Sequence, residues 1–393
     1  MRRILFLTFY FEPDLCAGSF RNSPLASELA RQAGDGVEVD VLTTLPNRYA
    51  SFRPDAPEEE VRGNLRIRRL RMPLHEGGFL DQARAFLAFD RGVGAFIEDR
   101  EYDMIYASTS RFFTGHLGYR IASERRLPLY LDLRDIFTEK MQDMLPGRTV
   151  LRVTLFPFVQ RMERRTLEYA SHVNVISEGF LDHLEPYPRL STSVFTHGID
   201  AFFLDAKAPA ESQRDVRVVV YAGNIGRGQS LDLILPPTAK ALEGRFRFVV
   251  VGDGSTRPRL EAALGQANVT NVEVRDPVPR RQLVDVYAAA DYLLIHQNDA
   301  PSRERDTPSK VFELAAFDKP ILAGVGGFSA RFIRHNVSNS FVFAPGDVEG
   351  LVRYLSTTPY TLERRDTFIR RFRRDEINRR MAASILNVLG AER

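Results

Sequence analysis

The chain has 393 residues, of which 44% are hydrophobic and 27% charged, and its formal net charge is +3. This composition excludes a disordered or fibrous chain, and the length is too great for one ordinary core, so we expect a soluble protein of two domains. The small net charge argues against general nucleic-acid binding, the single cysteine excludes a disulfide framework, and no uncharged apolar run approaches the roughly 20 residues that span a bilayer. A cytoplasmic protein is therefore expected.

Apolar strands and helices alternate through the first half of the chain. The run at 4–9 is almost continuously apolar, which is typical of a parallel strand buried on both faces. Further strands are predicted at 37–42, 65–70, 104–107, 129–133 and 172–176, and helices at 24–32, 80–100, 114–125 and 151–169. This alternation predicts a doubly wound parallel sheet. A linker of polar, alanine and proline residues follows at 205–215, where we place a domain boundary.

The same pattern restarts after the linker. A strand predicted at 216–222 ends in a glycine-rich turn, 223–228, which opens a helix at 231–242. The next expected elements are strands at 246–251, 272–274 and 292–295 and a helix at 280–289. Open α/β sheets bind ligands at the edge where such strands end. We therefore expect an α/β protein with two Rossmann-like doubly wound domains facing across a cleft, 1–205 and 206–361, with a helix at about 362–393 packing back on the first.

The stretch at 307–316 predicts a helix with a polar face. Thr307 is a good N-cap, and Pro308 fits the first helical position because its missing N–H would be unpaired there anyway. Ser309 and Lys310 lie one turn before Glu313, so the three side chains share a face at the positive end of the helix. Such an end suits a diphosphate, and the carboxylate can accept hydrogen bonds from a ribose diol. An ordinary capped helix with a solvated lysine–glutamate pair explains these residues equally well.

Two further observations concern phosphate binding. Only five of the 54 basic residues are lysines, so Lys310 departs from the general use of arginine, and a compact ammonium suits a phosphate. The turn at 223–228 can bring backbone N–H groups against phosphate, and Arg227 adds a positive charge. Turns of this kind are more often purely structural, so that alternative stays open.

Several short motifs follow one another in a recognisable order. They are LDLRDIF at 131–137, VIS at 175–177, HGID at 197–200, YAGN at 221–224, VGDG at 251–254, AAD at 289–291 and the stretch at 308–321. With these motifs the chain resembles, over nearly its whole length, the retaining glycosyltransferases of family 4, which have the GT-B fold, and among them bacterial enzymes that build surface polysaccharides. The resemblance implies a nucleotide-diphosphate sugar donor held by the C-terminal domain, a glycan or lipid-linked acceptor held by the N-terminal domain, transfer with retention, and no metal or other cofactor.

The resemblance also implies roles for individual residues. Glu313 matches the second glutamate of the family's pair, which holds the donor ribose, whereas the first falls at Arg305 and is missing; Glu304 or Asp306 is a possible substitute. The expected catalytic residues are Lys310, Arg227 and Glu313, the first two stabilising the leaving diphosphate. The other expected donor-binding residues are Gly223, Asn224, Gly226, Gly252, Val278, Thr307, Ser309 and Val311.

The predictions outside the donor site are less specific. Gly18, after the first strand, and Arg134 with Asp135, after a later one, are expected to face the acceptor; the alternative for the last two is an ion pair at a strand end. Arginines flank apolar residues at 148–165, as in helices that lie on anionic membranes, although packing against a core is the commoner explanation.

Two other functions remain as alternatives. The missing glutamate at Arg305 suits a nucleotide-sugar-binding subunit without activity of its own. A nucleotide-sugar epimerase can share the fold, but no pair of carboxylates in the expected cleft favours it.

Overall fold

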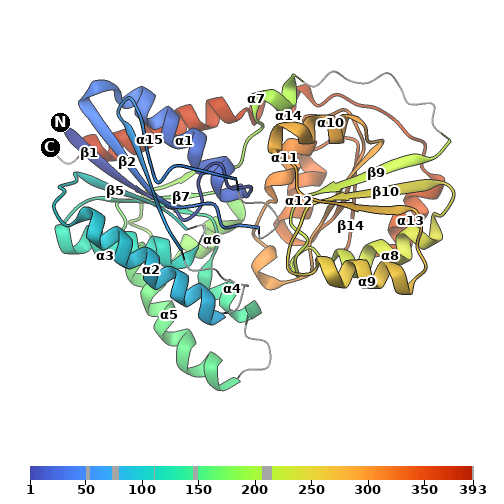
Figure 1. Ribbon diagram of the computed structural model, residues 1–393, viewed down its shortest axis with the longest axis horizontal. Helices are drawn as coiled ribbons and strands as arrows, with labels where there is room; N and C mark the ends of the chain where they lie inside the picture. The colour runs from blue at the N-terminus through green and yellow to red at the C-terminus, as the bar shows by residue number, and fades with distance from the viewer. Residues whose placement is uncertain (50–53, 73–78, 110, 145–148, 206–214, 392–393) are drawn as a thin grey trace. The chain divides into compact units, whose positions relative to one another are not determined.

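A computed structural model of the chain describes residues 1–49, 54–72, 79–109, 111–144, 149–205 and 215–391. These residues form two compact units, Met1–Thr196 with Glu376–Arg393, and His197–Asp375. Each unit has a mainly parallel sheet with helices on both faces, so the expected α/β class with two Rossmann-like domains is confirmed (Figure 1). Residues 206–214, most of the expected linker, lie outside the described residues.

The first unit is built on an eight-stranded sheet in the order β3-β4-β2-β1-β5-β6-β7-β8. Its strands are β1 (Arg2–Leu7), β2 (Val37–Thr44), β3 (Glu59–Arg62), β4 (Leu65–Leu70), β5 (Met104–Ser108), β6 (Leu129–Leu133), β7 (His172–Val175) and β8 (Thr192–Val194). All neighbours are parallel except β3 and β4, an antiparallel pair that the sequence patterns did not predict.

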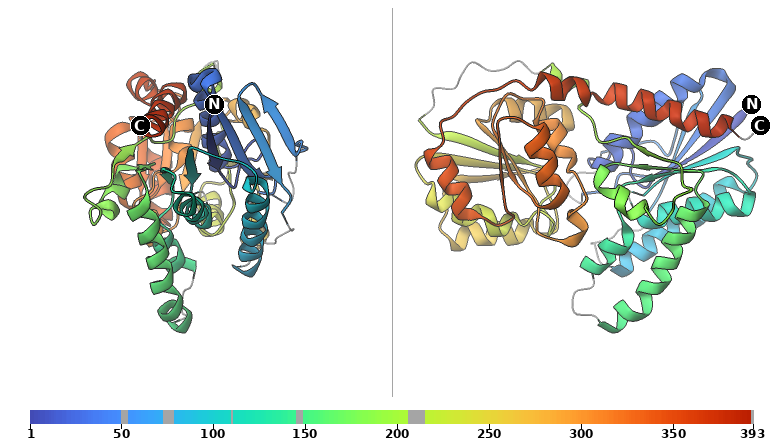
Figure 2. Two further views of the ribbon diagram at one scale, coloured as in Figure 1. Left: turned by 90° about the vertical axis from the view of Figure 1, so that its left-hand side faces the viewer. Right: turned by 180° about the vertical axis from the view of Figure 1, so that it is seen from behind.

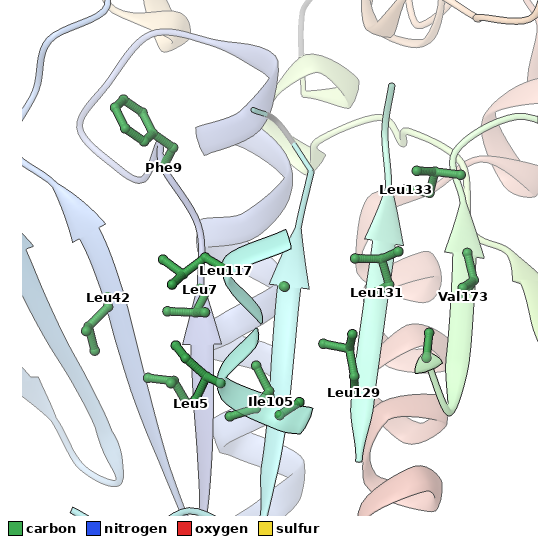
Figure 3. Packing of buried hydrophobic residues seen from close by; sticks show 14 of the residues in the cluster. Leu5, Leu7, Phe9, Leu42, Ile105, Leu117, Leu129, Leu131, Leu133 and Val173 are labelled. Carbon is green, nitrogen blue, oxygen red and sulfur yellow. The ribbon is translucent and has the colours of Figure 1, made fainter. Parts of the chain in front are cut away.

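The central strand β1 is apolar without interruption from residue 4 to its end because both of its faces are buried. Leu5 and Leu7 belong to the buried cluster on one face of the sheet, and Ile4 and Phe6 to the cluster on the other. Figure 3 shows the first of these clusters, with Leu5 and Leu7 on β1 beside Ile105 on β5, and the leucines of β6 on the far side of β5. Every side chain along β1 from residue 4 to residue 7 is therefore in a core.

Helices cover both faces of this sheet (Figure 1). One layer holds α2 (Phe79–Ile97), α3 (Phe112–Arg125) and α5 (Thr149–Tyr169), and the other α1 (Ala17–Ala33) and α15 (Arg374–Gly390). The short helices are η1 (Gly34–Gly36), α4 (Phe137–Met144), η2 (Glu178–Phe180) and α6 (Leu181–Leu184). Pro24 lies inside α1, so this helix begins earlier than the one predicted at 24–32.

The end of the chain packs on the unit in which it begins. Met381 and Ile385 of α15 are buried in the same cluster as Phe6. Arg2 Nη1 donates to the carbonyl of Leu389 at 3.0 Å, so the two termini lie side by side (Figure 2).

The limits of the two units differ from the predicted ones. The chain leaves the first unit after Thr196, earlier than the predicted 205, and returns after Asp375, later than the predicted 361. A backbone bridge inside the second unit accounts for both differences: the Ile199 N–H donates to Phe372 O at 2.8 Å, and the Arg374 N–H donates to Ile199 O at 2.9 Å. At this bridge the expected C-terminal helix is divided into α14 (Asp366–Arg371) and α15.

The second unit has a six-stranded parallel sheet in the order β11-β10-β9-β12-β13-β14. Its strands are β9 (Arg217–Ala222), β10 (Phe246–Val251), β11 (Val272–Arg275), β12 (Tyr292–His296), β13 (Ile321–Gly324) and β14 (Ser340–Phe343). Counted within the unit this order is 3-2-1-4-5-6, so the direction of winding reverses between β9 and β12. Ligands bind outside the carboxyl ends of the strands at such a switch point.

Helices again lie on both faces of the second sheet (Figure 1). They are α7 (Ala201–Leu204), α8 (Leu231–Ala241), α9 (Arg257–Gln266), η3 (Arg280–Gln282), α10 (Leu283–Ala288), η4 (Pro301–Arg303), α11 (Ser309–Leu314), α12 (Gly327–Asn336), α13 (Val348–Thr357) and α14. Residues of α8, α9 and α13 form one core with the sheet. Phe312 of α11 packs against Phe332 of α12 and Phe368 of α14, which fixes α11 beside the switch point.

Candidate functional site

The turn after β9 and the first residues of α11 meet at the switch point of the second unit. Gly223 begins the turn with a φ of 136°, which favours glycine, and a Cβ atom there would overlap Cε and Nζ of Lys310. The lysine Nζ donates to Tyr221 Oη at 2.7 Å and lies 3.9 Å from the centre of that ring. Tyr221 Oη donates to the Asn224 carbonyl at 2.6 Å. The lysine is thereby tied to the backbone of the turn.

The ammonium group of Lys310 is poorly solvated. Burial lowers its pKa from the usual 10.5 to about 7, and the Glu313 carboxylate opposes this shift only in part. A lysine with such a pKa takes up a full positive charge when an anion binds beside it. The turn and Lys310 together therefore form a candidate phosphate site.

A second glycine turn supports the first. Gly252, which follows β10, has a φ of 153°, and a Cβ atom on it would overlap the carbonyl oxygen of Gly223. The Gly223 N–H donates to Val251 O at 2.8 Å, and Gly226 is buried against the side chain of Asn224. Gly252 therefore acts on the site by allowing the two turns to touch.

Glu313 lies one turn after Lys310 in α11 and is only 5% exposed. Its Oε1 accepts a hydrogen bond from Arg280 Nη2, and its Oε2 accepts none from the described residues. Arg280 also donates to Asp200, whose Oδ1 lies 2.7 Å from Arg374 Nε. The carboxylate is thus held at one oxygen and keeps hydrogen-bonding capacity at the other, which a ribose hydroxyl can use.

A second arginine, Arg303, lies against the turn that contains Arg227. Arg227 is exposed, and its side chain forms no hydrogen bond or ion pair with the described residues. A Cβ atom on Gly228 would lie 2.7 Å from Arg303 Nη2, so this guanidinium covers the turn. Arg303 also pairs with Asp306 at 3.3 Å, whereas Glu304, the other candidate for the missing glutamate, is exposed.

The start of α11 differs from the predicted one. Its N-cap is Pro308, with φ −58° and ψ 131°, and no side chain caps the helix, so Thr307 as N-cap was wrong. The φ of proline fits an extended loop as well as a helix, and here Pro308 ends the loop. Ser309 is the first of six helical residues, so the dipole at this end is weaker than a long helix would give. Val311 is fully buried.

The remaining predicted residues are more scattered. Thr307 is buried, and Val278 is half-buried in the loop after β11. Gly18 is buried in the first turn of α1, and Arg134 and Asp135 follow β6, so all three lie in the first unit. Arg134 is only 7% exposed, and within the described part of the chain it forms no ion pair, with Asp135 or any other residue.

Sequence reasoning missed the partners of the central residues. Tyr221, Arg280 and Arg303 are brought to the site by the loops and strands that surround it, and of the three only Tyr221 stands in one of the motifs named above, YAGN. Two signals were available: Tyr221 opens the YAGN motif, and Asp200, whose charge holds Arg280, ends the HGID motif.

The strand order of the two sheets and the glycine turn at the switch point define a protein of two Rossmann-like domains. Residues 23–189 match the family described as glycosyl transferase 4-like domain, and residues 216–358 match the family described as glycosyl transferases group 1. The chain belongs to the glycosyltransferases of the family 4 type, which have the GT-B fold.

Three known proteins show the extent of the similarity. A D-inositol 3-phosphate glycosyltransferase of Thermobispora bispora is 26% identical over 346 residues, which are 80% of this chain and 76% of the relative. Sucrose-phosphate synthase of Thermosynechococcus elongatus has a TM-score of 0.75 at 17% identity, with 100% of both chains covered. Anabaena HepE, solved in complex with UDP and glucose, has a TM-score of 0.65 at 18% identity, covering 98% of this chain and 99% of HepE. At these identities the solved structures support the fold alone.

Proposed function

We propose that the protein transfers a sugar, with retention, from a nucleotide-diphosphate sugar to a hydroxyl group of a glycan acceptor, and that the second unit binds the donor. The observation that carries the proposal is the Lys310 ammonium packed on the Gly223 turn, with Glu313 one turn further along α11. Both lie at the switch point between β9 and β12, where sheets of this order bind nucleotides.

The residues around the turn suit the departure of a diphosphate. As the glycosidic bond breaks, negative charge grows on the leaving oxygens, and preorganised N–H groups and cations stabilise it. Lys310 and Arg303 are the cations on the turn, and Arg227 is an exposed third one. The leaving phosphate oxygen can accept the acceptor's proton, so retention requires no protein carboxylate as nucleophile.

Glu313 would hold the donor ribose through Oε2, while Arg280 keeps Oε1 in place. Because Arg305 stands where the family has its first glutamate, we propose that the transferred sugar is held by other contacts than the usual ones. We expect no metal in this reaction; within the described residues no three His, Cys, Asp or Glu side chains are grouped so that they could bind one.

For the acceptor we propose a lipid-linked glycan of cell-surface polysaccharide synthesis, reached at an anionic membrane surface on the cytoplasmic side. Phe158 of α5 is 61% exposed, and Arg161 and Arg165, three and seven residues later, are exposed on the same helical face. Val159 instead packs into the unit, against Met141. Among the described helices none is long and apolar enough to cross a bilayer.

Cosedimentation with phosphatidylglycerol vesicles tests this surface. Replacing Arg161 and Arg165 by alanine should weaken binding roughly tenfold or more, at about 1 kcal/mol for each arginine. Arg164→Ala removes an exposed arginine of another face, paired with Glu168, and should have the smaller effect. Equal binding by all three proteins would contradict the proposal.

The donor site is tested by thermal stabilisation with a panel of nucleoside diphosphates, beginning with UDP. One nucleotide should raise the melting temperature, because a ligand of the folded state stabilises it by mass action. Lys310→Ala and Glu313→Ala should reduce this rise, whereas Lys240→Ala, at an exposed lysine of α8 that pairs with Glu243, should not. No rise with any nucleotide would contradict the proposal. Binding without donor hydrolysis or transfer would favour a subunit that only binds nucleotide-sugar.

A further inference from the structure

Three arginines gather at the carboxyl edge of the first unit's sheet. Four adjacent strands, β2, β1, β5 and β6, run parallel and end at this edge. Arg48 follows β2, Arg111 follows β5 and Arg134 follows β6, and the loop after β1 lies between them. The winding of this sheet also reverses between β1 and β5, so the arginines surround its switch point.

Of the three arginines, Arg134 is the one whose side chain forms no hydrogen bond or ion pair with the described residues. It is only 7% exposed, and its Nε and Nη1 are buried without a hydrogen-bond partner among the described residues. Burying a guanidinium group without hydrogen-bond partners costs on the order of several kcal/mol of folding free energy, and native proteins nearly always pair such a group. A side chain placed in this way indicates an anion that is bound when the protein works.

The start of α1 lies at the same edge of the sheet, because the loop after β1 leads into it. Cys16 is the N-cap of this 17-residue helix, makes no side-chain cap hydrogen bond, and is followed by a first turn without an acidic residue. Burial raises the pKa of the Cys16 thiol and Asp14 adds to this, while the positive charges of Arg48 and Arg134 oppose it. The free N–H groups of the first turn, which contains Gly18, carry partial positive charge toward the same place.

The other groups at this edge hold the arginines without neutralising all of them. Arg111 Nη2 donates to Tyr10 Oη at 2.8 Å, and its guanidinium lies 4.2 Å from the centre of the Phe9 ring. Asp14 is buried, and its two oxygens accept the backbone N–H groups of Asn47 and Arg48 at 3.3 and 3.1 Å. Asp135 is a second, half-buried carboxylate beside Arg134. Asp132, whose pKa Arg134 also lowers, is already bound by Arg21 through both of its oxygens.

We propose that this edge of the first unit, with Arg134, Arg111, Arg48 and the first turn of α1, binds a phosphate group carried by the acceptor. Guanidinium forks and a helix N-terminus together match the oxygens and the double charge of a phosphate ester. The inference rests on the proposed function, because it assigns the phosphate to the acceptor of the sugar. It leaves open whether the phosphate belongs to a soluble acceptor or to a lipid.

Isothermal titration of the full chain with inorganic phosphate tests the site. The wild type should bind phosphate, and Arg134→Gln should weaken binding by at least about tenfold. Arg120→Gln, at an exposed arginine of α3 that pairs with Asp90, should bind as the wild type does. Equal affinity of Arg134→Gln and wild type, or no binding by the wild type, would overturn the inference. Should Arg134→Gln fail to fold, Arg111→Gln applies the same test.

Lys310→Ala separates this site from the donor site. If phosphate binding is lost in Lys310→Ala and kept in Arg134→Gln, the anion binds at the donor turn; the inference is then overturned and the proposed function stands. Binding that needs Arg134 and not Lys310, in a protein that no nucleotide stabilises, keeps the phosphate site and overturns the proposed function.

Two probes distinguish the sources of the phosphate. Binding of methyl phosphate that depends on Arg134 indicates a soluble phosphorylated acceptor. Binding to phosphatidylcholine vesicles containing phosphatidic acid that depends on Arg134, with Arg120→Gln as control, indicates a phosphate on a lipid. Failure of both probes to bind the wild type would overturn the inference.

Discussion

Each unit contains a buried arginine–carboxylate pair, and the two pairs differ in how many of the carboxylate oxygens accept hydrogen bonds. In the first unit Asp132 is bound by Arg21 through Nε and Nη2 at 2.9 and 2.8 Å, and also accepts from Asn174 at 2.7 Å and Ser108 at 3.3 Å. In the second unit Glu313 accepts one hydrogen bond from the described residues, from Arg280. Both oxygens of Asp132 are occupied, whereas Oε2 of Glu313 is not.

This difference separates a structural charge pair from one that is ready to bind a ligand. Arg21 also donates to the carbonyls of Phe195 and Thr196, so its pair ties the last residues of the first segment to the core. Burial would raise the pKa of Asp132, but Arg21 keeps it below the usual value, and the pair stays charged near neutral pH. Burial of a charge is therefore less informative than the hydrogen-bonding capacity that its partners leave unused.

The largest expected effect concerns stability. Asp132→Asn leaves Arg21 buried without its charge partner and should lower the free energy of unfolding by about 3–5 kcal/mol. Glu313→Gln should cost only about 1 kcal/mol, because Arg280 keeps its contact with Asp200. Urea denaturation followed by circular dichroism measures both, since the chain has no tryptophan. A larger loss of unfolding free energy in Glu313→Gln than in Asp132→Asn would contradict this distinction between the two pairs.

For nucleotide affinity the order of the same two variants should be reversed, with the larger loss in Glu313→Gln. Glu313→Gln should lower the affinity for the nucleoside diphosphate that stabilises the wild type by about 10- to 100-fold, as expected for the loss of a hydrogen bond to a charged group. Asp132→Asn should leave the affinity unchanged wherever the protein is folded. Calorimetric titration of both variants decides the matter, and equal losses would mean that Glu313 is not a ligand.

The pH dependence gives a third contrast: Lys310 changes its charge near neutral pH, whereas Asp132 stays charged there. The folded pKa of Lys310, about 7, lies below the usual 10.5, so between these values the unfolded chain binds the proton and the folded one does not. Stability without nucleotide should therefore rise with pH across this window. Nucleotide binding favours the charged lysine, so it should weaken above pH 7, by up to about tenfold per pH unit.

Titrations in buffers of different ionisation enthalpy measure the proton uptake that accompanies this binding. Lys310→Met should remove both the uptake and the pH dependence, and Lys240→Met should keep them. An unchanged pH profile in Lys310→Met would assign the proton to another group.

The smallest expected effect concerns the two arginines at the glycine turn, 223–228, of the proposed donor site. Arg303→Gln should weaken nucleotide binding by roughly three- to tenfold, since its guanidinium lies against Gly228. Arg227→Gln should change affinity less than about twofold, because an exposed and hydrated charge contributes little. The reverse order would restore Arg227 as the cation that contacts the diphosphate.

The sequence by itself determined most strands of the two sheets and the central residues of the candidate site. Continuous apolar runs with glycine or polar ends are typical of buried parallel strands, and these runs located ten of the fourteen strands in the described residues. The four that were missed, β3, β8, β13 and β14, have only three or four residues each. The helical spacing placed Lys310 and Glu313 on one side of α11. The prolines were less informative: α1 continues through Pro24, and α11 begins after Pro308, because one φ value fits both a helix and an extended loop.

The tertiary structure alone decided which groups become partners. Arg280 is 33 residues from Glu313, and Tyr221 is 89 residues from Lys310, yet both pairs are hydrogen-bonded. Tyr221 and Lys310 meet because β9 lies beside β12, an order that is set by the packing of the whole sheet and is not evident in any single segment. The lack of a partner for Arg134 is decided in the same way, since only the complete set of neighbours defines it.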